Sequence, residues 1–226
     1  MISIYADELI LPRQIAESES GYVFVGSKTR RSDNGKIIAL IDRNNDGYAE
    51  EKIIVAEGLD FPTGVSINNG DLYFSEINKI WKIKDIESWI GSSKLELPKR
   101  ELVTDNLPSD TWHGYKYIDF GPDNNIYVSV GAPCNVCTDP QKKDNRLGAI
   151  HRYSNGELTT IAEGVRNSVG FDWSPKNKKL YFTDNGRDWL GDNSPSCELN
   201  VVNKEGSFYG FPYKHAKNVI DPEFGA

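Results

Sequence analysis

Four short segments share one pattern, an apolar strand with an aromatic residue that ends at a small or hydroxyl-bearing residue. They are Val23-Phe24-Val25-Gly26, Leu72-Tyr73-Phe74-Ser75, Ile126-Tyr127-Val128-Ser129 and Leu180-Tyr181-Phe182-Thr183. The aromatic residues at 24, 73, 127 and 181 are 49, 54 and 54 residues apart. This is about the length of one four-stranded propeller blade, whose known repeats run to ~40–50 residues. The repeat predicts an all-β fold, a β-propeller.

Turn and strand patterns around these anchors support the same fold. Turn signals precede the anchors at Asn69-Gly70, Gly121-Pro122-Asp123 and Ser174-Pro175, which is typical of β-hairpins. Alternating apolar segments follow them, so we expect blades near residues 1–55, 56–108, 109–162 and 163–226. Helix is expected only around Asp85 to Ile90. Four blades make either a closed four-bladed propeller or part of a larger one.

Composition excludes several classes of partner. The 226 residues carry 26 Lys and Arg against 33 Asp and Glu, a net charge of −7, which disfavours nucleic acid and anionic membrane surfaces. No apolar run approaches the ~20 residues that a membrane-spanning helix needs. We therefore expect no nucleic-acid partner and no membrane-spanning segment.

The sequence at both ends of the chain suggests that it is cut from a longer protein. The N-terminus has no apolar stretch typical of a secretory signal, and the last residues, 209–226, read as a loop. We expect a single β-propeller domain over 1–226 that is a fragment of a longer protein.

Two motifs leave alternatives open. Cys134-Asn-Val-Cys137 fits a disulfide that stabilises a loop, a redox pair or half of a zinc site, and the disulfide is the simplest interpretation. The loop Asp42-Arg-Asn44-Asn-Asp46-Gly47 copies the first half of a calcium loop, with Glu50 or Glu51 in place of the usual last ligand. An ordinary Asx-turn loop explains the same residues.

Polar residues at the starts of two successive blades are candidates for a catalytic site. His113 directly precedes a first strand, where propeller side chains point into the central channel, and its imidazole suits a general base. Arg166 and Asn167 occupy the equivalent place one blade later, and Arg166 fits either the stabilisation of negative charge or a structural ion pair. The polar loop from Thr183 to Asp192 has carbonyls suited to a metal. No Gly-x-Ser-x-Gly elbow for a serine hydrolase is present.

An ordered set of motifs in this chain resembles the glucose/sorbosone dehydrogenase family, and most closely its sorbosone dehydrogenase-like branch. The motifs are Trp112-His-Gly, Phe120-Gly-Pro-Asp, Gly164-Val-Arg-Asn-Ser-Val-Gly170, Asp184-Asn-Gly-Arg-Asp-Trp-Leu-Gly-Asp192 and Tyr209-Gly-Phe-Pro212. The resemblance implies a six-bladed propeller, of which this chain would be about four blades. It also implies pyrroloquinoline quinone (PQQ) and calcium as cofactors, and oxidation of an aldose or sugar aldehyde.

The resemblance assigns roles residue by residue. His113 matches the base that takes the substrate's hydroxyl proton, Arg166 matches the arginine at the quinone oxygen, and Asn167 matches its cofactor-binding neighbour. The carbonyls of Gly186 and Arg187 match those that hold the calcium at the quinone, although the family often has Pro at the second position.

A second, structural calcium is implied at Glu198 and the Tyr209 carbonyl, where Cys197 replaces a common Asp. The resemblance further implies a periplasmic or secreted protein with a sugar substrate and a cytochrome as a candidate electron acceptor. The alternatives are a propeller lactonase-type hydrolase, or a non-catalytic sugar-binding or scaffold propeller.

Overall fold

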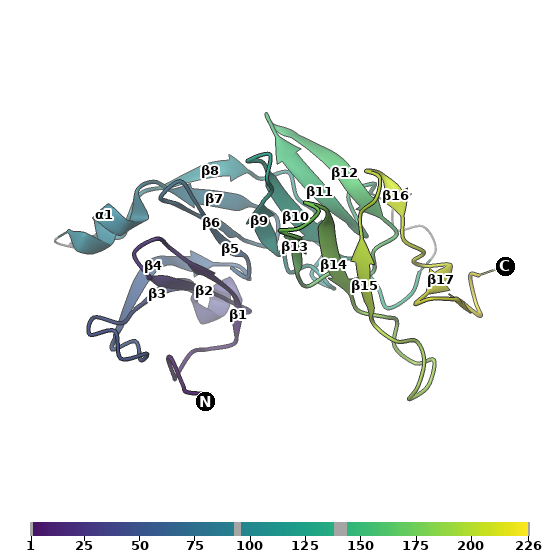
Figure 1. Ribbon diagram of the computed structural model, residues 1–226, viewed down its shortest axis with the longest axis horizontal. Helices are drawn as coiled ribbons and strands as arrows, with labels where there is room; N and C mark the ends of the chain where they lie inside the picture. Colours follow the sequence, from purple (N-terminus) through teal and green to yellow (C-terminus); the bar gives the residue numbers. More distant parts are fainter. Residues whose placement is uncertain (1, 93–95, 138–143, 226) are drawn as a thin grey trace. The chain divides into compact units, whose positions relative to one another are not determined.

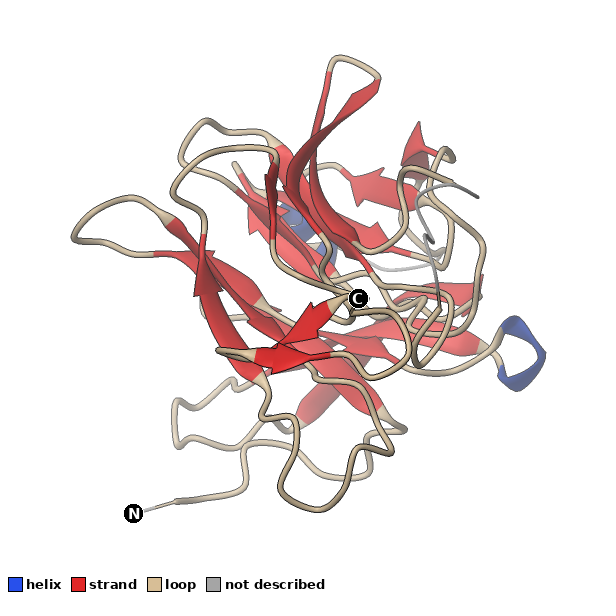
Figure 2. Cartoon of the chain, turned by 90° about the vertical axis from the view of Figure 1, so that its right-hand side faces the viewer, coloured by secondary structure: helices blue, strands red, loops and turns tan. Residues whose placement is uncertain are grey.

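Strands account for nearly all the regular structure of this chain. The structure is a computed structural model that describes residues 2–92, 96–137 and 144–225. Figures 1 and 2 show that short strands and long loops make up almost the whole ribbon. The chain consists of two compact units, residues 1–106 and 107–226.

The first unit contains two antiparallel four-stranded sheets in which chain neighbours pair in order. The first sheet comprises β1 (Pro12–Glu17), β2 (Val23–Ser27), β3 (Gly35–Ile41) and β4 (Glu51–Leu59), with a 3-10 turn at Arg31–Asp33. The second comprises β5 (Val65–Asn68), β6 (Asp71–Ser75), β7 (Ile80–Ile83) and β8 (Arg100–Thr104), with helix α1 (Ile86–Gly91) after β7. The short helix expected near Asp85 to Ile90 is confirmed.

The second unit contains the other two meanders. One comprises β9 (Ile118–Phe120), β10 (Ile126–Val130), β11 (Ala149–Ser154) and β12 (Glu157–Glu163), and β16 (Ser207–Phe208) adds to β12 in parallel. The other comprises β13 (Phe171–Trp173), β14 (Leu180–Asp184) and β15 (Glu198–Val201). A two-stranded ribbon of β17 (Lys214–His215) and β18 (Val219–Ile220) follows. The predicted all-β propeller fold with four blades is confirmed.

The four repeated segments become β2, β6, β10 and β14, but the aromatic residues that mark the repeat are not equally buried. Phe24 and Tyr127 are buried, whereas Tyr73 and Tyr181 are only half-buried. Their neighbours Phe74 and Phe182 face the core instead. They are 0% and 1% exposed. Side chains alternate between the two faces of a strand, so a one-residue shift exchanges core for surface.

Aromatic rings join the two meanders of the second unit. The Tyr127 ring from β10 meets the Trp173 ring from β13 edge-on at 4.8 Å between ring centroids, and Tyr117 meets Phe171 in the same way at 4.8 Å. Such pairs each contribute about 0.5–1.5 kcal/mol beyond the burial of their surface. This packing joins the β9–β12 meander to the β13–β15 meander.

Candidate functional site

His113 lies in a tight turn before β9 with its imidazole held in one orientation. Its backbone is left-handed (φ 49°), and Nδ1 lies 2.9 Å from the carbonyl oxygen of Ala132. A carbonyl oxygen only accepts, so Nδ1 carries the proton and Nε2 is the basic nitrogen. Burial, together with the charge of Arg166, lowers the pKa of His113 to about 4. The ring is therefore neutral near neutral pH, as a general base must be.

Gly131, directly after β10, lets the chain approach His113 closely. A Cβ atom at this position would lie 2.5 Å from the Cβ atom of His113 and 2.5 Å from its carbonyl oxygen. Ala132, the next residue, accepts from His113 and donates its N–H to the carbonyl oxygen of Arg166 at 2.8 Å. The end of β10 thus joins the expected base to the expected arginine.

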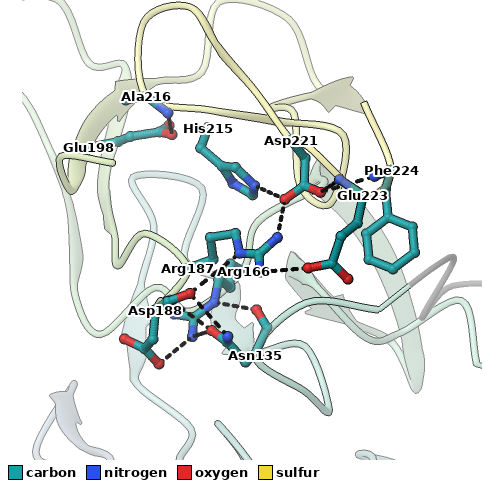
Figure 3. Close-up of polar contacts among 10 residues, drawn as sticks. All are labelled: Asn135, Arg166, Arg187, Asp188, Glu198, His215, Ala216, Asp221, Glu223 and Phe224. Atoms are coloured by element: carbon teal, nitrogen blue, oxygen red, sulfur yellow. Dashed lines mark hydrogen bonds and ion pairs between the residues drawn. The ribbon is translucent and has the colours of Figure 1, made fainter. Parts of the chain in front are cut away.

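Arg166 is buried, and its side chain is fully oriented by acceptors (Figure 3). Nε donates to the carbonyl oxygen of Asn135 at 2.7 Å, and Nη2 donates to Oδ1 of Asn135 at 2.8 Å and to Oδ2 of Asp188 at 3.2 Å. Nη1 donates to the carbonyl oxygen of Asn185 at 3.1 Å. A guanidinium has five N–H donors, so one Nη1 hydrogen has no acceptor among the described residues. Burial lowers the pKa of Arg166, and the charge of Asp188 counteracts this.

Asn135 belongs to the ring closed by a disulfide between Cys134 and Cys137. The disulfide interpretation of this motif is confirmed, and both sulfurs are consumed, which removes the half-zinc-site alternative. Cys197 is a free, exposed thiol. No pattern in the sequence assigns a role to Asn135, although an amide between two half-cystines is held in a short, constrained loop.

Asp184, at the end of β14, fixes the backbone of the Arg166–Asn167 segment. Its Oδ2 accepts from the Arg166 N–H at 2.9 Å and its Oδ1 accepts from the Asn167 N–H at 2.6 Å. Burial raises the pKa of Asp184 to about 7, although these two N–H groups act in the opposite direction. Asn167 in turn accepts from the N–H of Asn185 at 3.2 Å, which ties it to the loop of Gly186.

Arg187 has a buried side-chain role that the sequence did not reveal. Nη1 lies 2.6 Å from Oδ2 of Asp221 and Nη2 lies 3.0 Å from Oε1 of Glu223. The same Asp221 oxygen lies 2.8 Å from Nε2 of His215 (Figure 3). Burial acts to raise the pKa of Asp221, but the hydrogen bonds from His215 and Arg187 outweigh it and lower the pKa to about 2.

Both carboxylate oxygens of Glu198 already have protein donors. Oε1 accepts from the N–H of Ala216 at 2.5 Å and Oε2 accepts from Nδ2 of Asn200 at 2.8 Å. Glu198 pairs across the sheet with Asp184 and helps to raise its pKa. Tyr209 has other partners, since its hydroxyl donates to the carbonyl oxygen of Val201 at 2.9 Å. The second calcium at Glu198 and Tyr209 stays a prediction.

The calcium-loop motif lies in the first unit. Asp42, Asp46 and Glu50 bring their carboxylate oxygens within 4.8 Å of one another. Asp42 also accepts from the N–H groups of Asp46 and Gly47, an Asx-turn arrangement. Glu51 instead pairs with Arg43 at 2.6 Å. Calcium binding at this loop stays a prediction.

Taken together, the second unit gathers most of the residues expected at the site. A continuous set of hydrogen bonds links His113, Ala132, Arg166, Asn167 and Asn185, and it continues through Arg166 to Asn135 and Asp188. The expected base His113, the expected cation Arg166 and the loop of Gly186 and Arg187 are therefore connected through a few residues.

A family model for a domain of unknown function, DUF7133, matches residues 3–206. The chain belongs to this family. An uncharacterized protein of Borreliella burgdorferi is 32% identical over 214 residues, which are 92% of this chain and 53% of that protein. The DUF7133 chain thus spans about half the length of the curated relative that it matches.

Solved structures of a carbohydrate-active enzyme and of two sugar dehydrogenases share the fold. The calcium structure of a Trichoderma reesei carbohydrate-active enzyme of family AA12 gives a TM-score of 0.74 at 21% identity, over 92% of this chain and 57% of that one. The holo PQQ domain of Coprinopsis cinerea pyranose dehydrogenase gives 0.73 at 17% identity, over 96% and 57%. The PQQ-bound aldose sugar dehydrogenase of Streptomyces coelicolor gives 0.69 at 19%, over 98% and 69%. At these identities the likeness concerns the fold.

None of the helices in the described part of the chain has the length and apolar character needed to span a bilayer.

Proposed function

We propose that this DUF7133 chain carries the catalytic half-site of a quinoprotein oxidoreductase that oxidises an aldose or a sugar aldehyde with pyrroloquinoline quinone and calcium. The observation that carries the proposal is the state of His113, a neutral imidazole whose protonated Nδ1 is bound to Ala132 and whose Nε2 is basic. The propeller fold shared with sugar dehydrogenases supports it. As the chain spans 57–69% of those structures, we assign the activity to the whole protein, with these residues as about four blades of a six-bladed propeller.

The residues present fit the two cofactors. Among the residues that the structure describes, one N–H of the Arg166 guanidinium has no acceptor, which suits a quinone oxygen, and Asn167 follows Arg166 in the chain. The carbonyls of Gly186 and Arg187 are hard oxygen donors of the kind that calcium takes. When bound, calcium and the quinone would supply a Lewis acid and the two-electron acceptor for the hydride that leaves the substrate carbon.

The chain's own groups perform the proton chemistry. Nε2 of His113 takes the proton from the hydroxyl of the sugar or of the hydrated aldehyde, and the O–H bond electrons form the new C=O bond. The Ala132 carbonyl holds the imidazole in the tautomer that leaves Nε2 able to accept, and stabilises the positive charge that the ring gains. Arg166 supplies positive charge beside the site where negative charge develops.

Cellular location and electron acceptor belong to the same proposal. We infer a periplasmic or secreted enzyme, in keeping with the Cys134–Cys137 disulfide, because such bonds persist in oxidising compartments. A cytochrome is the candidate acceptor for the electrons of the reduced cofactor.

The test is dye-coupled oxidation by the full-length protein loaded with pyrroloquinoline quinone and calcium, over a panel of aldoses and aldehydes. Dye reduction that requires both cofactors and is lost in His113→Gln is the expected result. Hydrolysis of lactones with a divalent metal, without dye reduction, would instead identify a propeller lactonase-type hydrolase. Sugar binding without turnover would identify a non-catalytic propeller.

A further inference from the structure

A four-residue disulfide ring holds the buried arginine of the site. Cys134 and Cys137 close the ring, and Asn135 is the member that faces Arg166. Asn135 is 9% exposed and Arg166 is 3% exposed, so neither exchanges these partners for water without disturbing its surroundings.

The contacts of Asn135 form a clamp with two sides. Its backbone carbonyl oxygen accepts from Nε of Arg166 at 2.7 Å and its side-chain Oδ1 accepts from Nη2 at 2.8 Å, so backbone and side chain together bind one edge of the planar guanidinium. On the other side, Oδ1 accepts from the N–H of Asp188 at 2.7 Å and Nδ2 donates to the Asp188 carbonyl oxygen at 3.2 Å. Asp188 closes the arrangement through its own carboxylate at Nη2 (Figure 3).

We propose that Asn135, presented by the Cys134–Cys137 ring, is the positioning residue that fixes the Arg166 guanidinium and the Asp188 backbone for the site next to His113. A flexible arginine has many rotamers, and two parallel hydrogen bonds from one acceptor residue select a single orientation of the fork. The disulfide restricts the loop that carries this acceptor. The effect on cofactor binding rests on the proposed function, whereas the effect on Arg166 itself does not.

Two readouts on the full-length protein without cofactor test the clamp directly. One is the pKa of His113 from NMR of the imidazole signals, because the Arg166 charge lowers that pKa and Asp188 acts to raise it. The other is the solvent-exchange rate of the Arg166 Nη2 hydrogens, one of which is bound to Oδ1 of Asn135. In Asn135→Ala, which removes Oδ1, we expect the pKa of His113 to rise by about 0.5 or more and the Nη2 hydrogens to exchange at least tenfold faster. His151, bound to the Arg146 carbonyl and Thr160, serves as the internal reference.

The matched control is Asn203→Ala. This exposed asparagine accepts from Nζ of Lys179 at 2.6 Å and has no contact with Arg166. We expect it to leave both readouts unchanged. Titration with pyrroloquinoline quinone and calcium, followed by the quinone's absorbance, forms a third arm, in which Asn135→Ala should weaken binding about tenfold or more relative to Asn203→Ala.

A lower melting temperature in Asn135→Ala with unchanged His113 pKa and unchanged Nη2 exchange would make Asn135 a structural residue and overturn the proposal. If Asn135→Ala does not fold, the wild-type protein with its Cys134–Cys137 bond reduced decides by the same two readouts, which should move in the same directions. Failure of the wild type to bind the quinone would count against the proposed function alone, because the two cofactor-free readouts would still decide the clamp.

Discussion

Nη1 of Arg187 lies 2.6 Å from Oδ2 of Asp221, and the two side chains are 4% and 0% exposed. The contact joins the loop after β14 to the segment after β18, which are 34 residues apart in the chain. A buried charge without its partner is costly, so the pair fixes the loop of the Gly186 and Arg187 carbonyls as well as the C-terminal segment. The side chain of Arg187 therefore has a structural role next to the carbonyl role proposed for its backbone.

Removal of the Asp221 carboxylate should destabilise the protein strongly. Asp221→Ala leaves the Arg187 charge buried without its main partner, for which we expect a loss of about 3–5 kcal/mol in the free energy of unfolding. Glu205→Ala is the control, because Glu205 pairs with Arg152 at 2.9 Å on the surface of the same unit. Loss of this surface pair should lower the free energy of unfolding by at most ~1 kcal/mol. Denaturant unfolding measures both, and equal small losses would contradict the prediction.

Acid should remove the stabilisation that the Asp221 carboxylate provides, over a defined pH range. The pKa of Asp221 is lowered to about 2 in the folded protein, against an ordinary value of 3.8. A lowered carboxyl pKa stabilises the fold above the unfolded-state pKa, and this stabilisation is lost as the pH falls from about 4 through about 2. We expect the difference in unfolding free energy between wild type and Asp221→Asn to shrink by about 2 kcal/mol over this range. A difference that does not change with pH would show that Asp221 does not titrate in this way.

His113 should control the proposed reaction through its protonation. His113→Gln should lower kcat/KM about 10²–10⁴-fold, because the proton then has no positioned acceptor. In the wild type, the acid limb of the kcat/KM profile should follow the pKa of about 4, well below that of a free imidazole. Steady-state dye-coupled assays with Asn203→Ala as the control measure both. An acid limb at the ordinary histidine value would mean that another group acts as the base.

The addition of a single methyl group at Gly131 should lower both stability and activity. In Gly131→Ala the new Cβ would meet the His113 Cβ and carbonyl oxygen at 2.5 Å, so the His113 turn must move. We expect a loss of stability of about 1–3 kcal/mol and at least a tenfold loss of kcat/KM. At Gly170 the nearest atom to an added Cβ is 3.9 Å away, so Gly170→Ala is the control and should retain activity. Normal activity in Gly131→Ala would contradict the close positioning of His113.

The fold was predictable from local patterns, and the site only in part. The repeat anchored at Phe24 and Tyr127 located β2 and β10 because strand alternation and hairpin turns depend on neighbouring residues. His113 and Arg166 were found as candidates because each begins a blade. Their connection through the two backbone groups of Ala132 could not be predicted, since no pattern in the sequence marks which carbonyl meets which side chain.

Periodicity, turn residues and cysteine spacing, each read within a few residues of chain, were enough to predict the strand segments, the helix after β7 and the disulfide candidate. Three other features depend on tertiary packing: Phe74 and Phe182 face the core, Asn135 binds Arg166, and Arg187 pairs with Asp221. Burial and buried hydrogen bonds depend on which distant segments share a water-free space. That space exists only once the sheets have packed together.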